Sequence, residues 1–197
     1  MPKPLPIIID TDPGQDDAVA ILMALASPEF EVLGITAVAG NVPLAPTEVN
    51  ARKICELAGR PDIKVYSGAI RPMLRPLVTA EHVHGKTGLD GPVLPDPTMP
   101  LQKQHAVDFI VETLMARPAG TVTLCTLGPL TNIGLALQSA LASFDQQGLY
   151  VDALRVRAFP FADDVLDFIA AHDQVFVVEQ NRDAQLRTLL MVEGGID

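Results

Sequence analysis

The 197-residue sequence contains only two cysteines, Cys55 and Cys125, which lie far apart and lack the spacing of metal ligands. Both stand in apolar stretches, which indicates reduced thiols in a hydrophobic core. The sequence therefore gives no sign of a disulfide framework, and we expect a protein of the reducing cytoplasm.

Long apolar runs and basic residues are scarce as well. No stretch reaches the roughly 18 uninterrupted apolar residues of a membrane-spanning helix, and the opening MPKPLP does not have the pattern of a signal peptide. Lysine and arginine number 14 against 24 acidic residues, for a net charge of -10. We therefore expect a soluble protein that has neither a membrane nor a nucleic acid as its partner, because binding to phosphates needs a basic face.

What is present is an alternation of short β-branched or apolar runs with longer amphipathic stretches, in a chain that is 48% hydrophobic. This alternation predicts βαβ units, and thus a three-layer α/β fold with a mostly parallel sheet of about six strands. The predicted strands cover residues 6–12, 32–40, 64–68, 121–128, 153–159 and 174–180. The predicted helices cover residues 15–26, 45–58, 104–117, 129–140, 163–172 and 183–191. The long stretch between them, from Ser67 to Gln104, is predicted to be a functional loop or lid.

Four aspartates crowd the end of the first predicted strand, in IIIDTDPGQDDAVAIL: Asp10, Asp12, Asp16 and Asp17. Ligands of open α/β sheets bind outside the carboxyl ends of the strands. Several carboxylates that converge there favour a hard cation, Ca²⁺ or Mg²⁺. The alternative is helix capping plus solvated surface acids, which accounts for one or two of the aspartates but not for four.

Five motifs, taken in order, resemble the inosine–uridine-preferring nucleoside hydrolases over about residues 5–140. They are DTDPGQDDAVAI, AVAGN (37–41), HVHGKTGLDG (82–91), HAVDFI (105–110) and TLCTLGPLTNIGLAL (123–137). The resemblance implies Ca²⁺-assisted hydrolysis of the N-glycosidic bond of a ribonucleoside to base and ribose, as in purine and pyrimidine salvage. It also implies a homo-oligomer.

The resemblance further implies which residues form the metal site. Asp12 would bind Ca²⁺ and accept a proton from the attacking water. Asp17 and the main-chain carbonyl of Thr126 would be further ligands, and Asp10 would support them from behind.

On the substrate side, the resemblance implies that Asp16 binds ribose hydroxyls, that Asn41 orders the pocket, and that His84 lies near the substrate. Simpler interpretations stay open for two of these residues. Asn41 follows a glycine and could occupy a left-handed turn position. His84, like His82, could be a solvated loop histidine.

Beyond Leu137 the family pattern does not continue, and residues 148–197 instead resemble the C-terminal part of the alpha subunit of 2-oxoacid:ferredoxin oxidoreductases. The most specific piece is FVVEQNRDAQL. We therefore expect a nucleoside hydrolase-like domain over 1–140 and a β-α-β-α segment over 141–197 packed on the same sheet. The seam near 138–147 suggests a junction of two unrelated pieces, from a chimera, a genomic rearrangement or a gene-model error.

This arrangement leaves the function open between an enzyme and a binding module. The family's remaining calcium and ribose ligands do not follow Leu137, so we expect turnover to be weak or undetectable. The alternative is a non-catalytic scaffold with residual Ca²⁺ and ribose binding. A fragment of a thiamine-diphosphate oxidoreductase is a third hypothesis, although the tail has no CxxC motif for a cluster.

Overall fold

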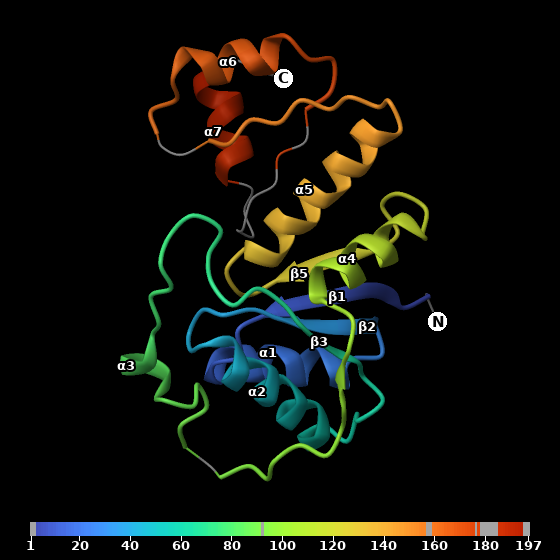
Figure 1. The fold of residues 1–197 in the computed structure, drawn as a ribbon, viewed down its shortest axis with the longest axis vertical. Coiled ribbons are helices and arrows are strands. Elements are labelled where there is room, and N and C mark those ends of the chain that lie inside the picture. Colours follow the sequence, from blue (N-terminus) through green and yellow to red (C-terminus); the bar gives the residue numbers. More distant parts are fainter. Residues whose placement is uncertain (1–2, 92, 157–158, 176, 178–184, 195–197) are drawn as a thin grey trace. The chain divides into compact units, whose positions relative to one another are not determined.

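The computed structural model describes residues 3–91, 93–156, 159–175, 177 and 185–194. The chain divides into two compact units, Met1–Ser143 and Phe144–Asp197. Figure 1 labels their helices and strands, apart from β4.

The first unit contains all five strands of the sheet, which are parallel and ordered β4-β3-β2-β1-β5. The strands are β1 (Leu5–Thr11), β2 (Phe30–Ala37), β3 (Val65–Ser67), β4 (Leu101–Gln102) and β5 (Thr123–Thr126). The helices of this unit are α1 (Gln15–Ala26), α2 (Leu44–Leu57), α3 (Glu81–His84), α4 (Ala106–Met115) and α5 (Thr131–Gln146), the last of which runs past the boundary.

Alternation along β1 produces the three layers. Ile7 and Ile9 face one core, which they share with Ile21 of α1 and Ile54 of α2. Ile8 faces the opposite core, which is formed with residues of α4 and α5. Because β1 is buried on both faces, it reads as a continuous apolar run rather than an alternating one. The predicted three-layer α/β fold is thereby confirmed (Figure 1).

The predicted number of strands needs correction. Among the described residues of the second unit there is no strand, so the expected strand at 153–159 and the β-α-β-α pattern are wrong where they can be checked. Leu154 is 42% exposed and Phe159 55% exposed, so their apolar side chains do not pack as those of a core strand would. Of the strand expected at 174–180, the described residues 174, 175 and 177 are not in a strand, and the others lie outside the described residues.

Helix positions are predicted closely, while the long loop holds two short elements that the sequence pattern did not indicate. Helix α1 has the predicted bounds, because Gly14 caps its start and Ser27 precedes Pro28, which disfavours further helix. The stretch between Ser67 and Gln104 contains α3 and β4, of four and two residues, which are too short to show periodicity.

The second unit contains α6 (Asp163–Ala170) and α7 (Gln185–Gly194). After α6, His172 makes two contacts: its Nδ1 lies 2.5 Å from the Phe168 carbonyl oxygen and its Nε2 lies 3.0 Å from Asp152. These contacts, led by the one with the carbonyl, raise the pKa of His172.

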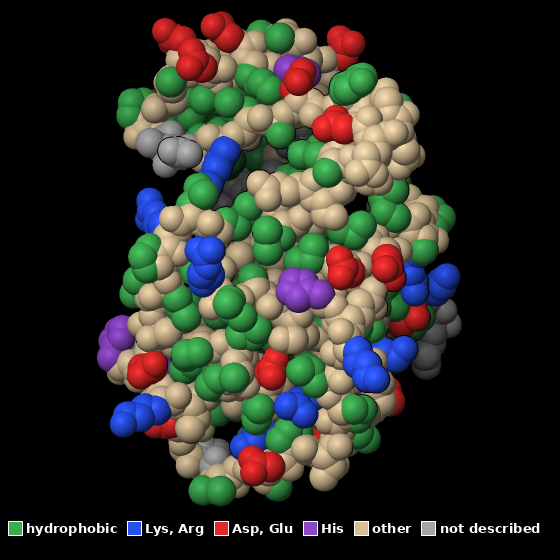
Figure 2. Space-filling model, viewed as in Figure 1, with side chains coloured by type: hydrophobic (Ala, Val, Ile, Leu, Met, Phe, Trp, Pro, Cys, Tyr) green, Lys and Arg blue, Asp and Glu red, His purple; other side chains and the backbone are tan. Residues whose placement is uncertain are grey.

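In Figure 2, lysine and arginine side chains lie interspersed with acidic ones on the face shown. No helix within the described parts of the chain is both long and apolar enough to cross a membrane.

Candidate metal and substrate site

The aspartate turn lies where the strand order of the sheet reverses. Strand β1 is followed in the chain by β2 on one side, while its other neighbour β5 comes from the far end of the unit. Such a switch point opens a crevice at the carboxyl ends of the two strands. Asp12 directly follows β1 there, and Thr126 ends β5 with its Cα level with Asp10 in the sheet register.

The structure gives the four predicted aspartates different surroundings. Asp10, Asp12 and Asp17 are 0%, 5% and 7% exposed, whereas Asp16 is exposed on the first turn of α1. The turn therefore buries three carboxylates close together and leaves the fourth available to solvent or ligand.

Asp17 closes the start of α1. Its Oδ2 accepts from the Gly14 N–H at 3.0 Å and its Oδ1 accepts from the Thr11 hydroxyl at 2.8 Å. This is the reciprocal half of a capping box. Helix capping, the alternative considered for the aspartates, thus accounts for part of the role of Asp17.

Asn41 holds Asp12 in place. The Asn41 main-chain N–H donates to Asp12 Oδ2 at 2.6 Å, and its side-chain amide donates to the Asp12 carbonyl at 3.0 Å and to Asp17 Oδ2 at 3.4 Å. One residue therefore bridges the two predicted metal-binding carboxylates.

Two glycines leave room for the Asp12 carboxylate. A Cβ on Gly40 would overlap Asp12 Oδ2, and a Cβ on Gly128 would lie 2.7 Å from Asp12 Oδ1. Neither position accepts a side chain without displacing the carboxylate, so the loops after β2 and β5 form a close-fitting cradle around it.

Asp10 is buried near the end of β1, just before the turn. Its Oδ1 accepts from the Thr36 hydroxyl at 2.6 Å and from Asn132 Nδ2 at 2.8 Å. Its Oδ2 is buried without a hydrogen-bond partner among the described residues. Burial outweighs the two hydrogen bonds and raises the pKa of Asp10 to about 6.

Sequence reasoning missed Asn132, which connects three strand ends. Its Nδ2 also donates to the Ala37 carbonyl at 3.1 Å, and its Oδ1 accepts from the Ala69 N–H at 2.9 Å. An asparagine at the start of a predicted helix, in TLGPLTN, was the only local signal.

The surroundings of Asp12 suit a cation. Burial, together with the charges of Asp17 and Asp10, raises the pKa of Asp12 to about 7 against the opposing hydrogen bond from Asn41. The candidate donors of the turn are all oxygens, which is the donor set of a hard cation such as Ca²⁺. In the described part of the chain, however, no three His, Cys, Asp or Glu side chains cluster as a metal site. The fit therefore depends on two carboxylates plus main-chain oxygen.

The loop that carries His84 is anchored to the aspartate turn. Asn50, buried in α2, donates to the Pro13 carbonyl at 3.1 Å and to the Thr87 carbonyl at 2.8 Å. The Ala80 N–H donates to the Asn41 carbonyl at 2.8 Å. The half-buried His84 is thereby brought next to the turn, while His82 is exposed.

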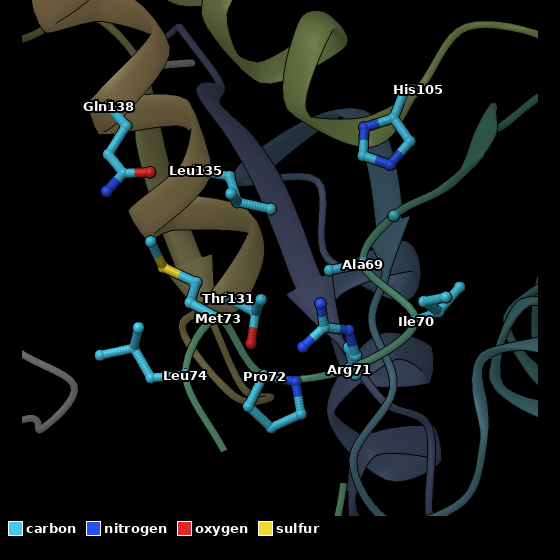
Figure 3. Close-up of a pocket in the computed structure, with 11 residues that line it drawn as sticks. Ala69, Ile70, Arg71, Pro72, Met73, Leu74, His105, Thr131, Leu135 and Gln138 are labelled. Atoms are coloured by element: carbon cyan, nitrogen blue, oxygen red, sulfur yellow. The ribbon is translucent and has the colours of Figure 1, made fainter. Parts of the chain in front are cut away.

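A pocket of about 510 Å³ opens beside the hydrogen bonds of Asn132 rather than at Asp12. Its wall is the segment 68–74 after β3, and Thr131, Leu135 and Gln138 of α5 line it together with His105 (Figure 3). The Ala69–Asn132 hydrogen bond fixes this wall to α5. None of the predicted site residues lines the pocket, so the pocket and the aspartate turn are separate features.

An α/β sheet with buried carboxylates at its switch point defines a class of ligand-binding proteins, and the comparisons identify the family. The profile of the inosine-uridine preferring nucleoside hydrolases matches residues 7–147. The chain belongs to this family.

Individual relatives agree with that assignment. The chain is 59% identical over 134 residues to an uncharacterised protein of Schizosaccharomyces pombe, and 49% identical over 135 residues to the pyrimidine-specific ribonucleoside hydrolase RihA of Salmonella paratyphi B. Each alignment covers 68% of this chain but only 43% of the relative, so the chain spans less than half the length of these relatives.

Solved structures show the same partial coverage. A purine-preferring ribonucleoside hydrolase from Gardnerella vaginalis superposes with a TM-score of 0.65 at 34% identity, covering 70% of this chain and 44% of the other. The plant nucleoside hydrolase PpNRh1 gives a TM-score of 0.63 at 39% identity, covering 70% and 43%.

Proposed function

We propose that this chain carries the metal- and ribose-binding part of a ribonucleoside hydrolase, which cleaves the N-glycosidic bond to free base and ribose. The observation that supports this most is the pair of buried carboxylates, Asp12 and Asp17, bridged by Asn41 at the sheet's switch point. Relatives named as purine-preferring and as pyrimidine-specific hydrolases support the reaction class and leave the base open.

The residues would act as follows. Asp12 and Asp17 would hold Ca²⁺ together with the Thr126 carbonyl, and Asp12 would accept the proton of the attacking water. A bound Ca²⁺ would supply positive charge that offsets the crowded carboxylates and acidifies water next to them. Exposed Asp16 would accept hydrogen bonds from ribose hydroxyls.

The test is the release of base from inosine, uridine and cytidine with and without Ca²⁺. We expect slow release that Asp12→Asn abolishes. Asp108→Asn, which changes an exposed aspartate on α4, is the matched control and should leave release unchanged. Release that survives Asp12→Asn would contradict the assignment.

A binding module without turnover is the second candidate. It is favoured by the finding that, among the described residues, no group of three His, Cys, Asp or Glu side chains could hold a metal ion. Titration calorimetry with Ca²⁺ and with ribose separates the candidates when combined with the release assay. Heat without base release supports the module, and no heat with either ligand excludes it.

For residues 141–197 we infer a scaffold or subunit-contact segment without redox chemistry, joined to the hydrolase-like part near 138–147. Its resemblance to an oxidoreductase alpha subunit stays a prediction, as does a homo-oligomeric state. Sedimentation velocity tests the oligomer. A binding assay with thiamine diphosphate tests the oxidoreductase hypothesis, for which we expect no binding.

A further inference from the structure

Gln15 is the residue between the Pro-Gly turn and the paired aspartates, and its exposed side chain contacts the histidine loop. Its Nε2 donates to the main-chain oxygens of His84 and Asp90, at 3.4 and 3.3 Å. Its Oε1 lies 2.5 Å from His84 Nδ1. Because carbonyl oxygens only accept, the two main-chain contacts fix which end of the amide is nitrogen.

The fixed amide determines the tautomer of His84. An amide oxygen can only accept, so the proton between the two groups belongs to Nδ1 of His84. In the neutral ring Nε2 then carries a lone pair and acts as an acceptor. His105 provides the opposite case within the same chain, because its Nδ1 accepts from the Val107 N–H at 3.3 Å and its neutral ring must carry the proton on Nε2.

His84 lies against the aspartate turn. A Cβ on Gly14 would lie 2.6 Å from His84 Nδ1 and 3.0 Å from the Asn41 amide nitrogen, so the ring and Asn41 both pack on the Gly14 backbone. The ring thus shares its immediate surroundings with the residue that bridges Asp12 and Asp17.

We propose that Gln15 is a positioning residue that holds His84 in the Nδ1–H tautomer, so that the neutral Nε2 accepts a hydrogen bond from a hydroxyl of the bound sugar. The ligand half of this inference rests on the proposed function, whereas the tautomer follows from the hydrogen bonds of the chain itself.

The first experiment measures the tautomers by long-range ¹H–¹⁵N correlation on histidine-labelled protein at about pH 8.5, where an ordinary imidazole is neutral. We expect Nδ1–H at His84 and Nε2–H at His105. Gln15→Leu should shift His84 towards Nε2–H without changing His105. Gln15→Glu, which keeps an acceptor oxygen, should retain Nδ1–H.

The matched control is Gln104→Leu, which removes a glutamine that bonds to Glu112 and should leave both tautomers unchanged. His82→Asn assigns the signal of the neighbouring exposed histidine. The proposal is overturned by Nε2–H at His84 in the unaltered chain, or by a tautomer that Gln15→Leu leaves unchanged.

The second experiment measures ribose binding by calorimetry with Ca²⁺ present. Loss of one correctly oriented hydrogen bond predicts binding about tenfold weaker in Gln15→Leu. Equal affinity in both proteins overturns the positioning role. Ribose that fails to bind even the unaltered chain contradicts the proposed function and the ligand half of the inference, while the tautomer measurement separately decides the role of Gln15 towards His84.

Discussion

Replacing Asp10 by asparagine tests the electrostatic cost of the aspartate turn. Asp10 is fully buried, and burial raises its pKa from 3.8 to about 6. A carboxyl with a raised pKa binds more protons in the folded state than in the unfolded state, between about pH 4 and pH 6. The stability that depends on Asp10 therefore falls as the pH rises through this window.

A pKa of about 6 in place of 3.8 corresponds to about 3 kcal/mol of stability once Asp10 is ionised in both the folded and the unfolded chain. At about pH 4 most of this cost is absent, because Asp10 stays protonated in the folded chain. The substituted asparagine carries no charge, so the stability of Asp10→Asn relative to the unaltered chain should increase by about 2 kcal/mol between about pH 4 and about pH 7.

The assay is urea unfolding followed by circular dichroism, with a chelator present, at both pH values. Asparagine can keep the hydrogen bonds from Thr36 and Asn132, but its new N–H₂ group takes the place of the unpartnered Oδ2. That exchange changes the stability of Asp10→Asn by about 1–3 kcal/mol at both pH values. This change therefore cancels when the stability difference between the two proteins at about pH 4 is subtracted from that at about pH 7. Asp108→Asn is the control for charge removal at an exposed site. A difference that does not change with pH would refute the burial argument.

Four further substitutions probe other contacts. Gly40→Ala should destabilise the chain by about 1–3 kcal/mol and weaken Ca²⁺ binding in calorimetry, because its Cβ would displace the Asp12 carboxylate. The control is Gly134→Ala in α5, whose Cβ would contact only the flexible Met73 sulfur, so this variant should be as stable as the unaltered chain or more stable in urea unfolding. An equal loss of stability in both glycine variants would contradict the close fit of Gly40 around Asp12. Asn132→Ala should cost about 3 kcal/mol in the same assay, since it leaves buried groups of three strand ends unpaired, and a loss under about 1 kcal/mol would show that they find other partners. The pKa of His172 is raised, so its protonated ring stabilises the second unit at low pH, and this effect is lost as the pH rises through the folded-state pKa. An NMR titration should show a lower pKa for His172 in Asp152→Asn. An unchanged pKa would exclude the ion pair.

The parts of the fold that sequence predicted well are those set by local chemistry. The apolar run of β1, the Pro-Gly turn and the end of α1 before Pro28 depend on neighbouring residues, and their positions agree with the structure. In the tail, an apolar alternating stretch at 153–159 indicated a strand. A strand also needs a partner with which to form hydrogen bonds, and periodicity says nothing about whether one is available.

The contacts that organise the candidate site join residues that lie far apart in sequence. Asn132 reaches Asp10 across 122 positions, and Gln15 reaches His84 across 69. A single sequence shows which residues can make such contacts but not which do. The four aspartates were predictable as a group because they are adjacent, whereas their separate roles depended on Thr11, Thr36 and Asn41, which carried no local signal for those contacts.

The two predicted metal-binding carboxylates differ in what the fold needs from them. Asp17 accepts hydrogen bonds from Thr11 and Gly14 that close the β1–α1 turn, so Asp17→Asn should destabilise the chain even without a cation. Asp12 is held mainly through Asn41, and its pKa of about 7 means that its charge destabilises the folded chain at and above neutral pH. Asp12→Asn should therefore stabilise the chain in chelator while removing Ca²⁺ binding. Opposite signs for the two variants in urea unfolding would mark Asp12 as the residue kept for its ligand rather than for the fold. If both variants destabilise the chain equally, the turn is explained by capping alone and the proposed metal site loses its strongest support.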